Sequence, residues 1–166
     1  SQMIGLSILP GHTARREKIA REYYEHKGSC LLCDMLDAER RGGRKRIFEN
    51  DFFFGYVPFA AQVPCQISLV PKNHCPDFNA ISQEQMRSFA AALRAILQCL
   101  CRKLDDPDYN YVIHSGSRQS RTLPWMHWHL QISPRTATKA GFEIGSGIPV
   151  NSSLPEADAA MLRGEA

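Results

Sequence analysis

Two histidines separated by one residue lie in the stretch PWMHWHLQISPR, residues 124–135. Successive side chains of a β-strand point to opposite faces, so this stretch predicts one polar face and one apolar face. The polar face carries His127, His129 and Gln131, and the apolar face carries Trp128, Leu130 and Ile132. An imidazole fixed on a strand can bind a metal, attack phosphorus as a nucleophile, or lie satisfied in the core. The spacing alone leaves these three interpretations open.

Cys30 and Cys33 have the Cys-x-x-Cys spacing with which one turn of chain offers two thiolates to a zinc ion. A structural zinc site takes four ligands, so two more must come from elsewhere. The available histidines are His12, His26, His74, His114, His127 and His129. His74 directly follows the strand-like run LVPKN, and His127 begins the last predicted strand. We therefore predict a structural Zn²⁺ site of Cys30, Cys33, His74 and His127; the alternative is a cysteine pair without a ligand.

A nucleophilic His129 would need a partner that fixes its tautomer and donors for the phosphoryl oxygens. Gln131 lies two residues further on the same predicted face and can donate through its amide. The stretch Ser115, Gly116 and Ser117 can add hydroxyl and backbone donors. Phosphate charge could be met by three nearby arginines, which are Arg118, Arg121 and Arg135.

The helices needed to position these residues are indicated by periodicity and by end signals. The segment 13–26 predicts a helix, with Gly28 just beyond it as a stop signal, and the segment 30–40 predicts a second, short helix. Ser82 followed three residues later by Gln85 is a capping box that opens a long helix. Its predicted core residues recur at helical spacing and are Met86, Phe89, Ala90, Leu93, Ile96, Leu97, Leu100 and Leu104.

The strands are indicated by β-rich runs between turn residues. The run 46–59 predicts a hairpin around its Asn-Asp pair, and the run 65–72 predicts another strand. Two further strands are predicted at 109–116 and 126–132. A loop-like tail ends in a short helix opened by Pro155. Hairpin-linked strands with one long covering helix predict an α+β domain with a mainly antiparallel sheet of about five strands.

The composition fits one globular domain with its own core, at 166 residues, 43% apolar and 22% charged. A net charge of +3 does not favour nucleic acid as a partner, and the basic run 40–46 is typical of a solvated loop. No apolar run approaches the roughly 20 residues of a membrane-spanning helix. No secretory leader is recognisable, so we expect reduced cysteines and a cytoplasmic location.

The stretch HWHLQI, residues 127–132, resembles the His-φ-His-φ-His-φ-φ signature of the histidine triad (HIT) superfamily, in which φ is apolar. Gln131 takes the place of the third histidine, as in the galactose-1-phosphate uridylyltransferase branch. Four other segments resemble the family. CLLCDML resembles its zinc-binding start, RIFENDFFFGYVPF and CQISLVPKNH resemble its central strands, and YNYVIHSGS resembles its penultimate strand. The tail AGFEIGSGIPVN…PEADAAMLR is similar to the end of two-module uridylyltransferase-related proteins, where it closes the C-terminal module.

This resemblance implies an α+β meander that forms a dimer, or a pseudo-dimer of two modules. It implies that His129 attacks the α-phosphorus of a nucleotide, and that a sugar phosphate, phosphate or water then accepts the nucleotide from the histidine. Gln131 and the loop of Ser115, Gly116 and Ser117 would assist. The predicted zinc ligands match the family's zinc positions.

The sequence departs from typical HIT hydrolases at two places. The segment GYVPF lacks the carboxylate that holds the ribose in those enzymes. The penultimate strand ends in His114, where an asparagine is usual. His114 could contact the substrate, or support either the metal site or His129. We group it with Arg135 among the candidate substrate-binding or phosphate-binding residues.

From the resemblance we expect an N-terminal helical extension (1–29), a HIT-like domain (30–135) and a tail (136–166) that packs on the domain or on a partner subunit. The expected partners are a nucleotide or nucleotide-sugar substrate and a second copy of the chain in a homodimer, with no membrane. Two functions compete. The first is a nucleotidyltransferase or nucleotide phosphohydrolase with a covalent nucleotidyl-histidine. The second is a non-catalytic, zinc-stabilised nucleotide-binding module, or the C-terminal half of a larger uridylyltransferase-like enzyme.

Overall fold

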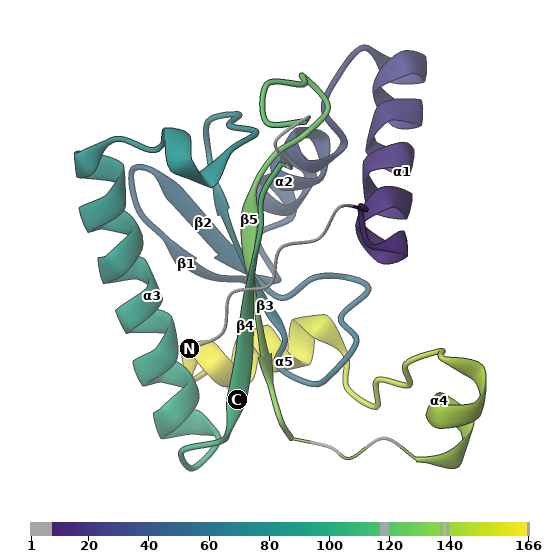
Figure 1. Cartoon of the computed structure of the whole chain (residues 1–166). Helices are drawn as coiled ribbons and strands as arrows, with labels where there is room; N and C mark the ends of the chain where they lie inside the picture. Colours follow the sequence, from purple (N-terminus) through teal and green to yellow (C-terminus); the bar gives the residue numbers. More distant parts are fainter. Residues whose placement is uncertain (1–7, 117–119, 137, 139, 166) are drawn as a thin grey trace.

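The computed structural model describes residues 8–116, 120–136, 138 and 140–165. Five strands form one antiparallel sheet in the order β1-β2-β3-β5-β4 (Figure 1). The strands are β1 (Arg46–Glu49), β2 (Phe53–Tyr56), β3 (Ile67–Pro71), β4 (Tyr109–His114) and β5 (His129–Pro134). The α+β architecture with an antiparallel sheet is therefore confirmed. The order places β5, which carries His129, between β3 and β4.

The hairpin of β1 and β2 is organised by Asn50. Its Oδ1 accepts the backbone N–H groups of Phe52 and Phe53 at 3.0 and 2.8 Å. Its amide nitrogen donates to the hydroxyl of Ser88 at 2.8 Å, which ties the turn to the long helix α3 (Gln83–Lys103). The predicted hairpin is confirmed, and its turn residue also anchors the helix across it.

Helix α3 and the apolar face of β5 build the main core. Ser82 caps the helix, and its capping box with Gln85 is present as predicted. The core residues from α3 are Phe89, Ala92, Ile96 and Leu100, and those from the β5 region are Trp128, Leu130 and Ile132. Met86 is 43% exposed and Ala90 is also exposed, so their prediction as core residues was wrong. The apolar stripe of α3 is wider than the face that the sheet covers.

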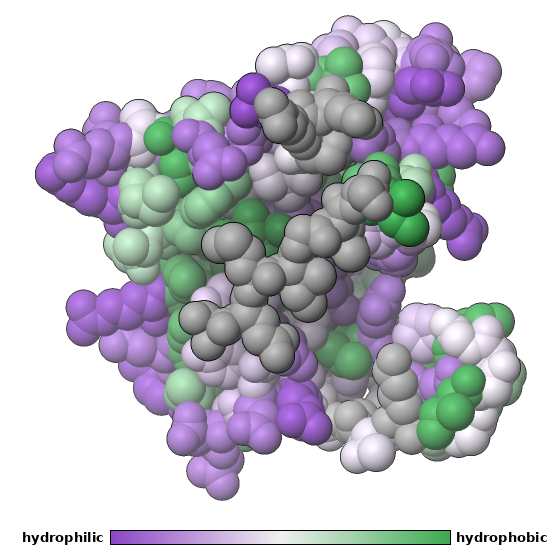
Figure 2. All heavy atoms as spheres, viewed as in Figure 1, coloured by the Kyte–Doolittle hydropathy of each residue, from purple (hydrophilic) through white to green (hydrophobic). Residues whose placement is uncertain are grey.

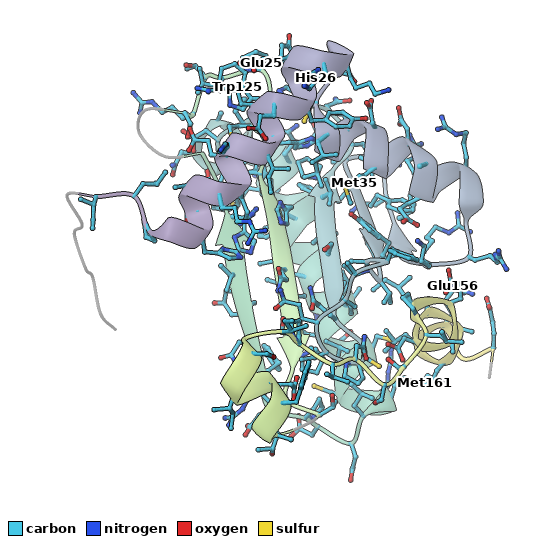
Figure 3. All side chains as sticks on the ribbon, turned by 90° about the vertical axis from the view of Figure 1, so that its right-hand side faces the viewer. Glu25, His26, Met35, Trp125, Glu156 and Met161 are labelled. Atoms are coloured by element: carbon cyan, nitrogen blue, oxygen red, sulfur yellow. The ribbon has the colours of Figure 1, made fainter. Side chains whose placement is uncertain are left out.

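The opposite face of the sheet is covered by α1 (Gly11–Lys27) and α2 (Leu31–Gly42). Leu36 of α2 packs in a small second core with three sheet residues, which are Phe54, Tyr56 and Val70. Helix α1 ends at Gly28 in the left-handed conformation, at the predicted stop. It has no buried residue, and Figure 3 shows it lying across the sheet. This arrangement leaves room for a cavity beneath α1.

The C-terminal segment contains two helices. Helix α5 (Pro155–Arg163) begins at the predicted proline and packs on β1 and α3, with Ala159 and Leu162 in the main core. Helix α4 (Gly141–Ser146) lies where the sequence predicted only a loop. Figure 2 shows apolar side chains on this segment, where Phe142 and Ile144 are exposed. Within the described ranges, no helix combines the length and the apolar character that crossing a bilayer requires.

Candidate active site and metal centre

Four predicted metal ligands meet where three segments converge. Cys30 and Cys33 lie at the start of α2, His74 follows β3, and His127 precedes β5. Strands β3 and β5 are neighbours, so the segments beyond their ends lie close together. The backbone N–H of Trp128 donates to the carbonyl of Cys75 at 2.9 Å, and this bond holds the segment before β5 against the segment after β3. The fold therefore brings together residues that lie far apart in sequence.

The spacing of these four side chains fits a tetrahedral metal site. With metal–sulfur and metal–nitrogen distances of about 2.3 and 2.0 Å, ligand atoms in a tetrahedron lie about 3.3–3.8 Å apart. The Sγ of Cys33 lies 3.3 Å from Nδ1 of His74 and 3.3 Å from Nδ1 of His127. All four ligand atoms lie within 4.8 Å of one another. The hydrogen bond between the two cysteines lowers the pKa of Cys30 and raises the pKa of Cys33, which favours one thiolate in the pair.

A cavity of about 590 Å³ lies between α1 and the sheet. Part of its lining is a polar group that includes Arg16, His129 and Gln131, which we call the polar end. The lining also includes apolar residues of α2, among them Leu31, Leu32 and Met35, and Figure 3 labels Met35. Cavities of this size and mixed lining are typical of small-molecule sites.

His129 and His114 lie side by side at the polar end, and Arg16 of α1 reaches both. The two residues pair across β4 and β5, and their ring centroids are 4.8 Å apart. The guanidinium of Arg16 donates to Nδ1 of His114 and lies 3.5 Å from Nε2 of His129. A guanidinium only donates hydrogen bonds, so the ring nitrogens that face it must be acceptors. The ring proton of His129 then lies on Nδ1, which is buried without a hydrogen-bond partner among the described residues, and its Nε2 lone pair faces Arg16.

Both imidazoles are held neutral at physiological pH. Burial, followed by the charge of Arg16, lowers the pKa of His129 to about 3. The same two causes lower the pKa of His114 to about 4, against an opposing hydrogen bond from Gln131. A neutral imidazole with an exposed Nε2 lone pair can act as a nucleophile, whereas an imidazolium cannot. Of the three roles left open for His114, the geometry favours support of His129, because the two rings lie side by side.

Gln131 lies next to this pair. It is cross-strand neighbour to Ser68 of β3 and to Val112 of β4, and its Nε2 donates to the hydroxyl of Ser133 at 3.3 Å. Gln131 and Ser68 both line the cavity. Their amide and hydroxyl groups are neutral donors on the floor beneath α1.

The loop after β4 uses its donors within the protein. The hydroxyl of Ser115 donates to Asp77 at 3.2 Å and accepts the N–H of Phe78 at 2.9 Å. The N–H of Gly116 donates to the carbonyl of Pro76 at 3.0 Å. Ser115 lines the cavity, but these groups already have partners within the protein and hold the loop in place. Ser117 and Arg118 lie outside the described residues.

Arg135 lies away from the polar end of the cavity. It follows β5 at the end opposite to His129, its side chain is exposed, and it forms an ion pair with Asp108 at 3.8 Å. Arg121 is also exposed. The arginine that does reach the imidazoles is Arg16, which the sequence did not indicate. No apolar face of α1 marks its inner side, so Arg16 could not be distinguished from the neighbouring charged residues.

The fold and this arrangement of residues define a HIT-like module. A zinc-bound histidine triad family protein from Mycobacterium smegmatis shares the fold, with a TM-score of 0.58, 21% identity, and coverage of 82% of this chain and 91% of that one. The family model described as galactose-1-phosphate uridyl transferase, C-terminal domain, matches residues 16–163. The chain belongs to this family.

Two relatives match almost the whole chain. ADP-glucose phosphorylase from Arabidopsis thaliana is 34% identical over 165 residues, which cover 98% of this chain and 46% of the relative. Galactose-1-phosphate uridylyltransferase from Thermotoga maritima is 25% identical over 171 residues, covering 98% and 53%. The crystal structure of the Arabidopsis ADP-glucose phosphorylase with bound ADP-glucose matches with a TM-score of 0.84 and 34% identity, over 95% of this chain and 50% of that one. The chain thus spans about half the length of these relatives.

Proposed function

We propose that this chain takes part in nucleotidyl transfer from a nucleotide sugar, with His129 as the nucleophile. The observation that carries the proposal is the neutral His129, which lies beside Arg16 in a cavity lined by both polar and apolar residues. The relatives are an ADP-glucose phosphorylase and uridylyltransferases, which supports a nucleotide-sugar substrate.

In the proposed reaction, Nε2 of His129 forms a bond to the α-phosphorus while the bond from that phosphorus to its bridging oxygen breaks. The sugar phosphate leaves, and an oxygen of phosphate, a sugar phosphate or water then displaces the histidine. The barrier to such transfers is lowered mainly by the positioning of the reacting groups and by stabilisation of the charge on the phosphoryl oxygens. Gln131 and Ser68 would donate to the phosphoryl oxygens from the sheet. We expect little help from the loop of Ser115 and Gly116, because its donors are already used.

We further propose that Cys30, Cys33, His74 and His127 bind a structural Zn²⁺ ion. Support comes from their thiolate and imidazole donors and their near-tetrahedral spacing. When bound, zinc would cross-link the starts of α2 and β5 with the end of β3. We also propose that the chain divides into an extension (1–29), a HIT-like domain (30–135) and a tail (136–166). We propose in addition that it forms a homodimer.

A second candidate function is that of the C-terminal half of a two-module enzyme, in which His129 binds substrate without attacking it. It is favoured by the match to a C-terminal domain model and by coverage of 46% and 53% of the relatives. The contact of Arg16 with Nε2 of His129 also favours it, because that contact must be released before attack.

Intact-protein mass spectrometry distinguishes the two candidates. The chain is incubated briefly at neutral to basic pH with ADP-glucose, UDP-glucose or a dinucleoside polyphosphate. A nucleotidyl adduct in the wild type and in His26→Ala, which alters an exposed histidine, but not in His129→Ala would support the nucleophile. Absence of an adduct in folded, zinc-loaded wild type would favour the binding half.

A further inference from the structure

Arg16 brings a positive charge under α1 that no described group neutralises. Its guanidinium is half-buried, its hydrogen bonds within the described residues go to the two imidazoles, and burial lowers its pKa. A guanidinium remains protonated in proteins even so. The charge therefore sits in the polar end of the cavity.

Two other cations of α1 have acidic partners, whereas Arg16 has none in the described part of the chain. Lys18 pairs with Glu22 at 3.8 Å, and Arg21 pairs with Glu25 at 3.4 Å. Among the described lining residues Glu17 is the sole carboxylate, and it forms no ion pair with Arg16. A half-buried charge without a counterion is costly unless a ligand supplies one.

Apart from the carboxylate of Glu17, the groups that line the cavity around Arg16 offer no negative charge, and several of them are neutral donors. His12, His114 and His129 can only be neutral or positive, and all three line the cavity. Gln131 and Ser68 present an amide and a hydroxyl from the sheet. An anion placed here would meet one fixed cation and donors from two directions.

The lining of the cavity restricts the class of anion that would fit. Besides Arg16 and the imidazoles, the same cavity of about 590 Å³ is lined by apolar residues, among them Leu31, Leu32 and Met35. A free inorganic ion would make no use of these apolar side chains. A ligand with a phosphate group attached to a flat, largely apolar ring system would use both the polar and the apolar lining.

We propose that Arg16 is the phosphate-binding residue of this cavity, and that its guanidinium exchanges the two imidazoles for the phosphoryl oxygens of a nucleotide. The planar guanidinium can donate two parallel hydrogen bonds to a phosphate. This exchange releases the Nε2 lone pair of His129. The nucleotide as the source of the phosphate rests on the proposed function, whereas the anion site rests on the cavity itself.

Calorimetry with zinc-loaded protein tests this inference, using ADP, pyrophosphate and adenosine as probes. Arg16→Gln should weaken binding of ADP and pyrophosphate roughly tenfold or more, because it removes a charge-assisted pair of hydrogen bonds. Arg15→Gln is the matched control, since Arg15 is the preceding residue of α1 and is exposed. It should bind like the wild type. Adenosine lacks phosphate, so Arg16→Gln should leave its binding unchanged.

The proposal is overturned if wild type binds neither ADP nor pyrophosphate, or if Arg16→Gln binds them as tightly as Arg15→Gln does. An equal loss of adenosine and ADP binding would also overturn it, since that shows general damage to the cavity. The result is separable from the fate of the nucleophile. If ADP binding depends on Arg16 but no covalent adduct forms, the anion site is supported and the nucleophile is rejected. If Arg16→Gln forms the adduct as well as wild type does, the nucleophile is supported and the anion site is rejected.

Discussion

Arg16, His114 and His129 form a contact in which one permanent cation faces two rings that can each take up a proton. Protonation of either ring would place a second positive charge beside the guanidinium in a partly buried site. The folded protein therefore resists a protonation that the unfolded chain accepts readily. At the scale of single residues, burial together with this repulsion lowers the pKa of both imidazoles and keeps them available as acceptors.

His114 makes the stability of the protein pH-dependent. Its pKa is about 4 when folded, against 6.5 as the ordinary value, so the unfolded state binds more protons between these values. Stability contributed by this residue is complete above about pH 6.5 and is lost as the pH falls toward 4. Urea unfolding of the zinc-loaded protein at pH 7.0, 6.0 and 5.0 measures the loss.

Two variants isolate the residue responsible for that loss. His114→Asn should show a shallower fall in unfolding free energy than wild type, because the titrating group is gone. Arg16→Gln should also reduce the fall, because it removes the charge that opposes protonation. Arg15→Gln should follow wild type. Identical pH profiles for all four proteins would show that His114 is not the source.

At the scale of elements, the loop after β4 is held by close packing around Gly116. A Cβ built on this residue would lie 2.9 Å from the Cα of Arg121 and 3.1 Å from the carbonyl oxygen of Pro76. Both neighbours are backbone atoms, so the loop must move to accept a side chain. Gly116→Ala should therefore lower the unfolding free energy by roughly 1–3 kcal/mol, measured by urea denaturation.

Gly145→Ala is the control for this substitution. Gly145 lies within α4, and an added Cβ would meet nothing within 4 Å. Alanine also favours helix over glycine, so the variant should be unchanged or slightly stabilised. If the two alanine variants had equal stability, the close packing around Gly116 would carry no energetic weight.

The elements with strong local signals could be predicted from the sequence. The Ser82 capping box, the Asn50 turn and the alternation around Trp128 each depend on residues close in the chain. Helix α4 was missed because its glycines and exposed apolar residues, such as Phe142, give no amphipathic period. A helix of this length depends on its surroundings more than on its own sequence.

The same distinction between local signals and long-range packing applies to the candidate site. The metal group could be proposed because its cysteine spacing is a local motif and its histidines follow strand ends. Arg16 could not, because its role depends on how α1 crosses the sheet, and α1 has no buried residue to reveal that packing. Ser115 as a phosphate donor stays a prediction, because it lines the cavity while its hydroxyl already bonds with Asp77 and Phe78.

At the scale of the whole molecule, the metal group links segments that the chain itself leaves far apart. Cys33 lies 41 residues from His74 and 94 residues from His127 in sequence. A bond that closes loops this long restricts the unfolded chain strongly. By analogy with cross-links of similar loop length, its loss should cost about 3–5 kcal/mol. The metal group is thus expected to affect global stability, whereas His129 is expected to affect chemistry alone.

Substitutions at His127, which precedes β5, and at His129, which begins it, separate the stability role of the metal group from the chemical role of His129. His127→Ala and Cys33→Ser should both lose the bound zinc, about one ion per chain, and melt at lower temperature. His129→Ala should keep the zinc and melt near the wild-type temperature, because its imidazole faces Arg16 and lies outside the four-ligand group. Cys101→Ser, which changes a cysteine of α3, controls for thiol loss as such. Elemental analysis with calorimetric melting measures both quantities. Retention of zinc by Cys33→Ser, or its loss in His129→Ala, would show that the ion is bound by a different set of side chains.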